Sequence, residues 1–236
     1  MNWSKIKGWG IGLLFLGMSI SSTAQTDSSD LWDNQMYLSN KVVWTKENWR
    51  YSGEFQVRLN NNTKSLDQYF LEGVATYMPS KHVEIVPDLR FTVHADKYEI
   101  RPGLGFIYKQ YWGKEAHKSQ LAHQFKYQMD LADGGVFRHG FRYIVFHNIV
   151  LSDKFLISSA AGGFYRWSEK FTGVQFARAM TGLAYSFDKK HIVSFSYFVG
   201  AENEGDYWGY IGGPIIQLVI RFDDEFKYIP AKYISF

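Results

Sequence analysis

The sequence contains no cysteine, which excludes a disulfide framework, a thiolate metal site and a lipid-anchored N-terminal cysteine. Common enzyme signatures are also missing, because the chain has no H-E-x-x-H, P-loop or G-x-S-x-G motif. The seven His residues are scattered without metal-ligand spacing, so we expect no metal and no other cofactor. The formal net charge of +3 gives no reason to expect a nucleic-acid partner.

Long hydrophobic runs are confined to the N-terminus, MNWSKIKGWGIGLLFLGMSISSTAQ. Lys5 and Lys7, a short apolar stretch at 9–20 and the small residues before Gln25 are typical of a secretory signal peptide. We predict that residues 1–24 are cleaved and that residues 25–31 form a short periplasmic leader. No later window of 18 apolar residues could form a transmembrane helix. The exported chain is therefore periplasmic, secreted, or inserted in the outer membrane as a barrel.

Aromatic residues, in contrast, are abundant at 18%, although the mean hydropathy is only −0.26. This combination suits a β protein in which apolar and polar residues alternate. Alternating segments occur at 32–44, 49–60, 66–78, 82–94, 97–111, 119–131, 136–150, 154–167, 174–187, 191–201 and 207–222. These segments are long for a soluble domain, but each would cross a bilayer as a tilted strand.

The two faces of each segment differ sharply. In WRYSGEFQVRLN (49–60), Arg50, Glu54 and Arg58 alternate with Trp49 and Phe55. In a soluble sheet the apolar face would be the core, whereas in a membrane barrel it would contact lipid. The strand length favours the second arrangement. We therefore predict an all-β fold, a single closed antiparallel transmembrane β-barrel over residues 32–236.

The predicted strand number is about 12, with 10 as the alternative. Eleven segments are evident, and bacterial barrels usually have an even number of strands. The tail at 225–236 could supply another strand, although its alternation is poor. Pro87, Pro102 and Pro214 lie inside predicted strands, so we expect bulges there.

Charged residues on the polar faces are predicted to form a network in the lumen. The predicted members are Glu54, Arg58, Glu72, Glu84, Asp88, Arg90, Glu99, Arg101, Lys126, Arg138, Arg142, Arg166, Arg178 and Arg221. The acids cluster in the first half of the chain, which predicts facing walls of opposite sign. The network either plugs the interior by ion pairing or lines a narrow channel for small anionic solutes. Between these charges, Gly103 and Gly105 are predicted to leave room for neighbouring lumen side chains.

Aromatic residues gather near the ends of the apolar faces, where amphipathic rings favour a membrane interface. The predicted interfacial aromatics are Trp44, Trp49, Tyr77, Tyr98, Tyr108, Trp112, Trp167 and Tyr185.

The opening WDNQMYLSNKVVW, together with GEFQVRLN, DKYEIRPGLGFIY, LAHQFKYQMDL and GFRYIVFHN, resembles a known family. This is a family of uncharacterised predicted outer-membrane β-barrels, a domain of unknown function typical of Bacteroidetes. The resemblance covers nearly all of residues 30–222 and implies a barrel of roughly ten to twelve strands. It implies no activity.

We therefore expect an integral outer-membrane protein, either a structural or accessory barrel or a narrow passive channel with a net basic lumen. Its expected partners are outer-membrane lipid, the barrel-assembly machinery during biogenesis and small anionic solutes, and we expect a monomer. One alternative is a barrel enzyme acting on lipid, suggested by the H-x-S pattern of His117 and Ser119. The other is a soluble exported β-sandwich that binds a ligand.

Overall fold

The computed structural model describes residues 32–112, 119–133, 136–169, 171–188, 190–203 and 205–222. The predicted signal peptide, the leader, His117 and the 225–236 tail lie outside the described residues. The strands are β1 (Trp32–Asn34), β2 (Met36–Lys46), β3 (Trp49–Asn60), β4 (Ser65–Ser80), β5 (Val83–His94), β6 (Tyr98–Trp112), β7 (Ser119–Ala132), β8 (Val136–Val150), β9 (Phe155–Trp167), β10 (Thr172–Ser186), β11 (Ile192–Asn203) and β12 (Trp208–Arg221). They coincide closely with the eleven predicted segments, the first of which is divided into β1 and β2.

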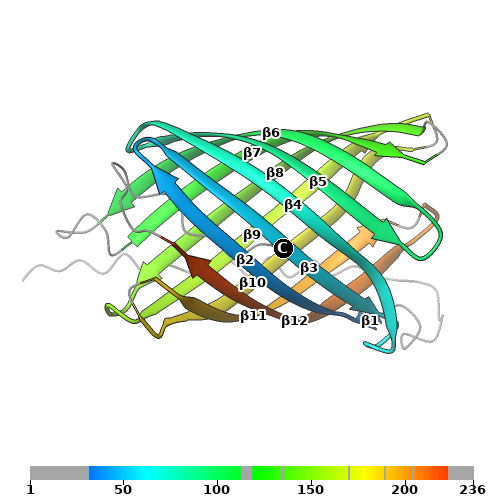
Figure 1. Cartoon of the computed structure of the whole chain (residues 1–236). Helices are drawn as coiled ribbons and strands as arrows, with labels where there is room; N and C mark the ends of the chain where they lie inside the picture. The colour runs from blue at the N-terminus through cyan, green and yellow to red at the C-terminus, as the bar shows by residue number, and fades with distance from the viewer. Residues whose placement is uncertain are drawn as a thin grey trace, which may run out of the picture.

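Strands β2 to β12 pair consecutively and antiparallel, and β12 then pairs with β2 to close a barrel (Figure 1). The closing pair is parallel and runs from Ile215↔Tyr37 to Arg221↔Val43. It is parallel because eleven alternating strands leave the first and the last pointing the same way. Strand β1 pairs with the rest of the same β12 edge. The predicted closed, all-β barrel is confirmed, and its parallel closure, called the seam below, makes it mixed rather than purely antiparallel.

The break between β1 and β2 falls at Gln35, opposite Gly213 and Pro214. A Cβ atom on Gly213 would lie 1.7 Å from the carbonyl oxygen of Gln35, so only glycine fits there. Pro214 has no N–H to donate, and the parallel ladder resumes at Ile215. The two residues together interrupt the first strand without opening the barrel.

The predicted bulges at the three prolines are wrong. The pairing on both sides of each proline keeps one register, with Pro87 opposite Leu104 and Pro102 opposite Leu89. Each proline instead lies beside a short gap in the ladder of one neighbour, which accommodates its missing N–H. The register shifts lie elsewhere, between Arg58 and Leu59, between Tyr77 and Ser80, and between Val174 and Phe176.

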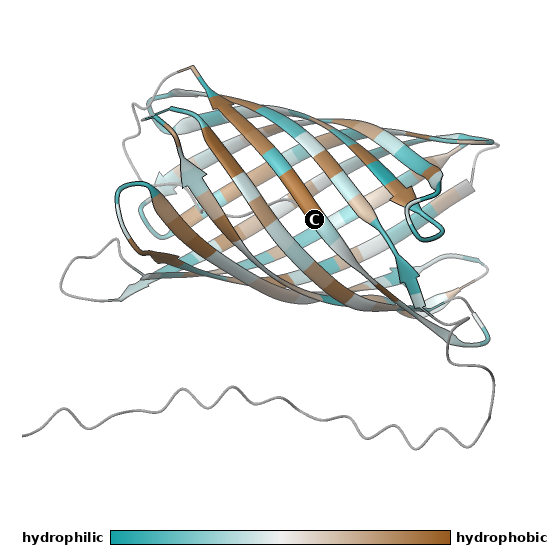
Figure 2. Ribbon diagram, turned by 90° about the horizontal axis from the view of Figure 1, so that it is seen from below, coloured by the Kyte–Doolittle hydropathy of each residue, from teal (hydrophilic) through white to brown (hydrophobic). Residues whose placement is uncertain are grey.

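Polarity in the barrel is reversed relative to a water-soluble sheet. Glu54 and Gln56 are 1% and 0% exposed, whereas Phe55 between them is 43% exposed. Hydropathy alternates in the same way along the other strands (Figure 2). None of the described residues forms a helix long and apolar enough to cross a membrane.

The interior also holds an apolar cluster. Its members are Tyr37, Val86, Ile107, Ala122, Ile144, Phe146, Ala160, Met180, Phe198, Ile211 and Ile215. Ile107, Phe198 and Ile215 are fully buried. Apolar side chains therefore fill part of the space that the charged side chains leave.

Close contact between β8 and β9 requires a glycine at 162, where a Cβ atom would lie 2.3 Å from the carbonyl oxygen of Tyr143. We expect Gly162→Ala to lower the free energy of unfolding by about 1–3 kcal/mol, because the backbone of β8 must move. Denaturant titration in detergent micelles, followed by tryptophan fluorescence, measures this loss. Gly73→Ala is the control, since no atom lies within 4 Å of its added methyl group. Equal stability of the two variants would contradict the packing described for β8 and β9.

Candidate functional site

The charged residues predicted for the lumen lie on the inward faces of their strands. Seven are buried: Glu54, Arg58, Glu72, Glu84, Arg90, Glu99 and Lys126. Seven are half-buried: Asp88, Arg101, Arg138, Arg142, Arg166, Arg178 and Arg221. Their positions along the barrel divide them into local groups, each held by its own ion pairs.

One group lies near the end of the barrel that carries the β2–β3 and β4–β5 turns. Lys109 Nζ donates a hydrogen bond of 2.9 Å to Glu84 Oε1, and both side chains are fully buried. Arg50 approaches the other oxygen of Glu84 at 3.6 Å. Lys109 was absent from the predicted network, although it shares strand parity with Glu99 and Arg101. Lys109 was not predicted because Ile107, two residues earlier on the same inward face, is apolar and breaks the run of polar residues.

A second group joins the two sides of the seam. Glu54 accepts hydrogen bonds from Ser39 Oγ at 2.7 Å and from Gln217 Nε2 at 3.2 Å, and it pairs with Lys41 at 3.2 Å. Gln217 also donates to Ser39 at 3.2 Å. One buried carboxylate therefore links β2, β3 and β12. Lys41 was not predicted, because Val43 is apolar on the same inward face.

A third group spans β4 to β7. Arg90 pairs with Glu72 at 3.0 Å, and Lys126 donates to Asp88 at 2.7 Å. A Cβ atom on Gly103 would lie 2.6 Å from Lys126 Cε and 2.7 Å from Asp88 Oδ1. The prediction that this glycine leaves room for lumen side chains is confirmed.

The remaining ion pairs lie toward the β1 end of the barrel. Arg138 pairs with Glu99, Arg166 pairs with Asp130 at 2.6 Å, and Arg178 pairs with Glu202. Glu202 was missed because the predicted segment ended at residue 201. Most pairs in the barrel join neighbouring or next-neighbouring strands, so the predicted facing walls of opposite sign are wrong. Each of the paired charges is therefore neutralised by a residue on a nearby strand of the wall.

Two arginines differ from the rest. Among the described residues, no carboxylate lies within 4.0 Å of the guanidinium nitrogens of Arg58 or Arg101. The Nε and Nη2 atoms of Arg101 are buried without a hydrogen-bond partner. Arg142 donates to Gln124 at 3.5 Å, and Arg221 is half-buried at the end of β12. Basic groups therefore exceed acidic groups in the interior.

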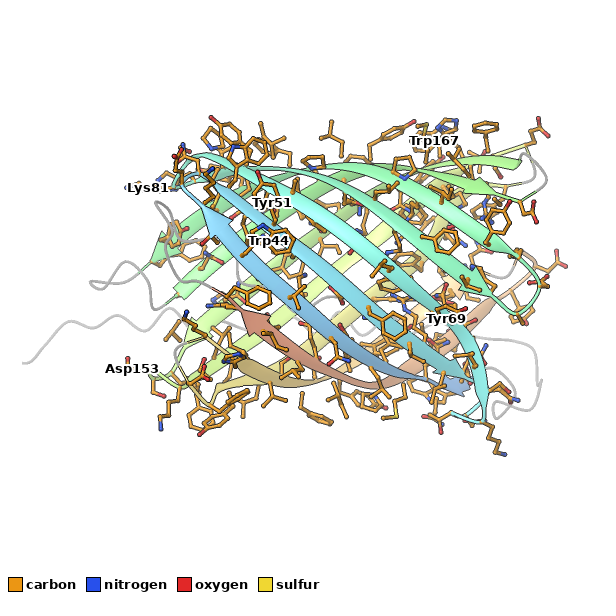
Figure 3. All side chains as sticks on the ribbon, viewed as in Figure 1. Trp44, Tyr51, Tyr69, Lys81, Asp153 and Trp167 are labelled. Atoms are coloured by element: carbon orange, nitrogen blue, oxygen red, sulfur yellow. The ribbon has the colours of Figure 1, made fainter. Side chains whose placement is uncertain are left out.

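The predicted interfacial aromatics lie on the outward faces near strand ends. Trp44, Trp49 and Tyr77 gather at the end opposite β1, where Trp49 and Tyr77 are 4.9 Å apart between ring centroids. Tyr108, Trp112 and Tyr185 are near the same end of their strands, whereas Tyr98 and Trp167 lie at the β1 end. Figure 3 shows Trp44 and Trp167 toward opposite ends of the barrel.

Polar contacts also occur on the outer face of β7 and β8. His123 is hydrogen-bonded to the Tyr143 hydroxyl at 2.8 Å, and His139 to the Tyr127 hydroxyl at 2.7 Å. Ser119 Oγ lies 3.1 Å from His147 Nε2. Within the described part of the chain, His147 has no second side-chain hydrogen bond to orient its ring as a catalytic base would need. No group of three or more His, Asp or Glu residues in these ranges could hold a metal ion.

The fully buried pair of Glu84 and Lys109 allows a double-mutant test of the interior. We expect Glu84→Leu alone to cost about 3–5 kcal/mol in the free energy of unfolding, because it leaves buried cations uncompensated. The double variant Glu84→Leu/Lys109→Met is expected to recover part of that loss. His191→Ala, which removes an exposed pair with Asp188, is the control and should cost at most about 1 kcal/mol. Additive single-variant losses would contradict a coupled pair.

Comparison with known proteins identifies the family. Residues 34–209 match the family described as a protein of unknown function, DUF2490. No curated protein matches the chain. The NanC porin in a rhombohedral crystal form has a TM-score of 0.48 and 8% identity, covering 71% of this chain and 86% of that chain. The KdgM porin in complex with disordered oligogalacturonate has a TM-score of 0.44 and 13% identity, covering 75% and 93% respectively. Neither likeness is close enough to carry an argument about function. Because the family match spans most of its length, the chain belongs to the DUF2490 family of proteins of unknown function.

Proposed function

We propose that this protein is an integral outer-membrane β-barrel, exported by the predicted signal peptide at residues 1–24. The observation that carries the proposal is the reversed polarity of the barrel wall. Leu89 and Leu104 are 55% and 56% exposed in the middle of their strands. A contiguous apolar surface of this kind is unfavourable in water and favourable against lipid tails.

Two further observations support a bilayer as the partner of this surface. Aromatic side chains lie near both ends of the outward face, as they do at membrane interfaces. The closed barrel also pairs its strand edges internally, which a bilayer requires. Folding by a barrel-assembly machinery and a monomeric state belong to the same proposal.

We further propose that the resting lumen is closed by side chains rather than open as a wide pore. Lys109, Glu84, Phe198 and Ile215 are fully buried inside the barrel. An interior of about eight strands is just filled by side chains, while sixteen strands leave a water channel. Eleven strands filled by ion pairs and apolar groups are closer to the first case. Any residual passage is narrow, and the excess of basic groups would favour small anions.

An arginine on the outer face tests the membrane proposal. We expect Leu89→Arg to destabilise the protein in lipid vesicles by about 2–4 kcal/mol, because it places a charge near the bilayer midplane. Tyr98→Arg, at a strand end, should cost only about 0–1 kcal/mol. Urea unfolding in vesicles, with heat-dependent migration on gels as the folding assay, gives both values. A protein that folds without detergent and tolerates Leu89→Arg would contradict the proposal.

Single-channel recording in planar bilayers tests whether side chains close the lumen. We expect no steady conductance from the native protein, because charged and apolar side chains occupy its interior. Glu54→Ala, which frees Lys41 and Gln217 beside the seam, is expected to open a small conductance with a reversal potential that favours anions. Arg142→Ala serves as a second opening variant. A steady native conductance would contradict the closed lumen while leaving the membrane proposal intact.

A further inference from the structure

A cavity of about 390 Å³ opens at the β1 end of the barrel. The residues that line this vestibule include Tyr37, Arg58, Asp67, Glu202, Tyr207 and Tyr210. Below it Tyr37 stacks on Phe198 at 4.8 Å between ring centroids, and both residues are buried. Two buried rings therefore lie at the inner side of the vestibule, and its size is in the range of small-molecule sites.

Arg58 is the unusual group in this pocket. It is only 8% exposed, and its guanidinium lies 4.4 Å from the ring centroid of Tyr37. Its Nε atom donates to Gln56 Oε1 at 2.7 Å. The guanidinium also lies 5.4 Å from the ring centroid of Phe70, and the side chain lines the cavity without a carboxylate partner among the described residues. A buried cation without a counter-charge is unfavourable, and a planar guanidinium is suited to a carboxylate.

Asp67 supplies a complementary group on the same pocket. It is the extra residue of the register shift in β4, since Arg58 pairs with Gln68 and Leu59 with Leu66. A bulge changes the direction of a side chain and is common beside functional sites. The Asp67 carboxylate accepts a 3.4 Å hydrogen bond from Asn60 and has no ion-pair partner within 4.0 Å in the described chain. It interacts with Arg58 electrostatically across the cavity.

The other acids of the vestibule are already occupied. Glu202 pairs with Arg178, while Asp33 accepts hydrogen bonds from Gln35 Nε2 at 3.1 Å and from the Asn62 backbone at 2.8 Å. These carboxylates would repel a dianion. The charged groups of the pocket that remain available to a ligand are therefore one cation, Arg58, and one carboxylate acceptor, Asp67.

We propose that the vestibule binds a small solute that carries one carboxylate and one hydrogen-bond-donating hydroxyl or ammonium group. Arg58 receives the carboxylate, Asp67 accepts from the donor group, and the rings of Tyr207 and Tyr210 contact the remainder. Hydroxy acids and zwitterions share this chemistry. The inference goes beyond the membrane proposal and does not depend on it, because the barrel fold alone forms the pocket.

Calorimetric titration of the folded, full-length protein in detergent tests the site with four probes. D-gluconate and L-serine carry both groups, propionate carries only the carboxylate, and D-glucose carries only hydroxyls. We expect gluconate or serine to bind at least tenfold more tightly than propionate and glucose. Binding by serine alone or by gluconate alone identifies the donor as ammonium or hydroxyl.

Two variants and a control complete the test. Arg58→Gln is expected to weaken the binding probe at least tenfold, and Asp67→Asn is expected to weaken serine more than gluconate. Lys46→Gln, an exposed cation at the other end of the barrel, should bind like the native protein. Heat-dependent gel migration verifies that each variant is folded. Loss of binding by a folded variant then concerns the site alone, because the membrane proposal is tested by the Leu89→Arg experiment. The inference is overturned if no probe binds, if glucose binds as well as the acids, or if Arg58→Gln binds normally.

Discussion

The neutralisation of buried carboxylates inside a closed wall is the interaction on which the rest of this structure depends. Glu54, Glu84 and Asp130 are almost completely buried, and each has a cation within about 4 Å. Removing such charges from water is costly unless both partners are well placed. The lack of a side chain at Gly103 likewise leaves the space that the Lys126–Asp88 pair occupies. One of the buried carboxylates also lies at the seam, where Glu54 adds side-chain links among β2, β3 and β12 to the backbone ladder that closes the barrel.

Much of the fold could be predicted because strand parity is a local property. One face of β3 is marked by Arg50, Glu54 and Arg58, and this pattern does not depend on which strands pair with β3. The bounds of the eleven predicted segments accordingly lie close to those of the observed strands. The parallel seam could not be predicted, because it depends on the number of strands that close the ring. The proline positions misled for a related reason. A missing donor can be absorbed by a gap in one ladder, and the sequence does not reveal what lies opposite Pro87.

The candidate site was predictable as a set of inward residues but not as a set of contacts. Lys126 reaches Asp88 across an intervening strand, and that distance depends on the stagger and tilt of the barrel. The vestibule could not be predicted for the same reason, because its residues come together only through the stagger of the strands. Arg58 was recognised as a lumen charge, yet its lack of a carboxylate partner is a property of its neighbours in space. Asp67 gave no signal, because its parity places it outward and only the register shift brings it to the cavity.

The odd number of strands has a topological consequence. Each crossing reverses the direction of the chain, so the start of β1 and the end of β12 lie at opposite ends of the barrel (Figure 1). In a barrel with an even count, the corresponding points share one side. In a bilayer, the first residue of β1, Trp32, and the last residue of β12, Arg221, would therefore face different aqueous compartments. Proteases or labels applied from one side would reach only one of these two strand ends.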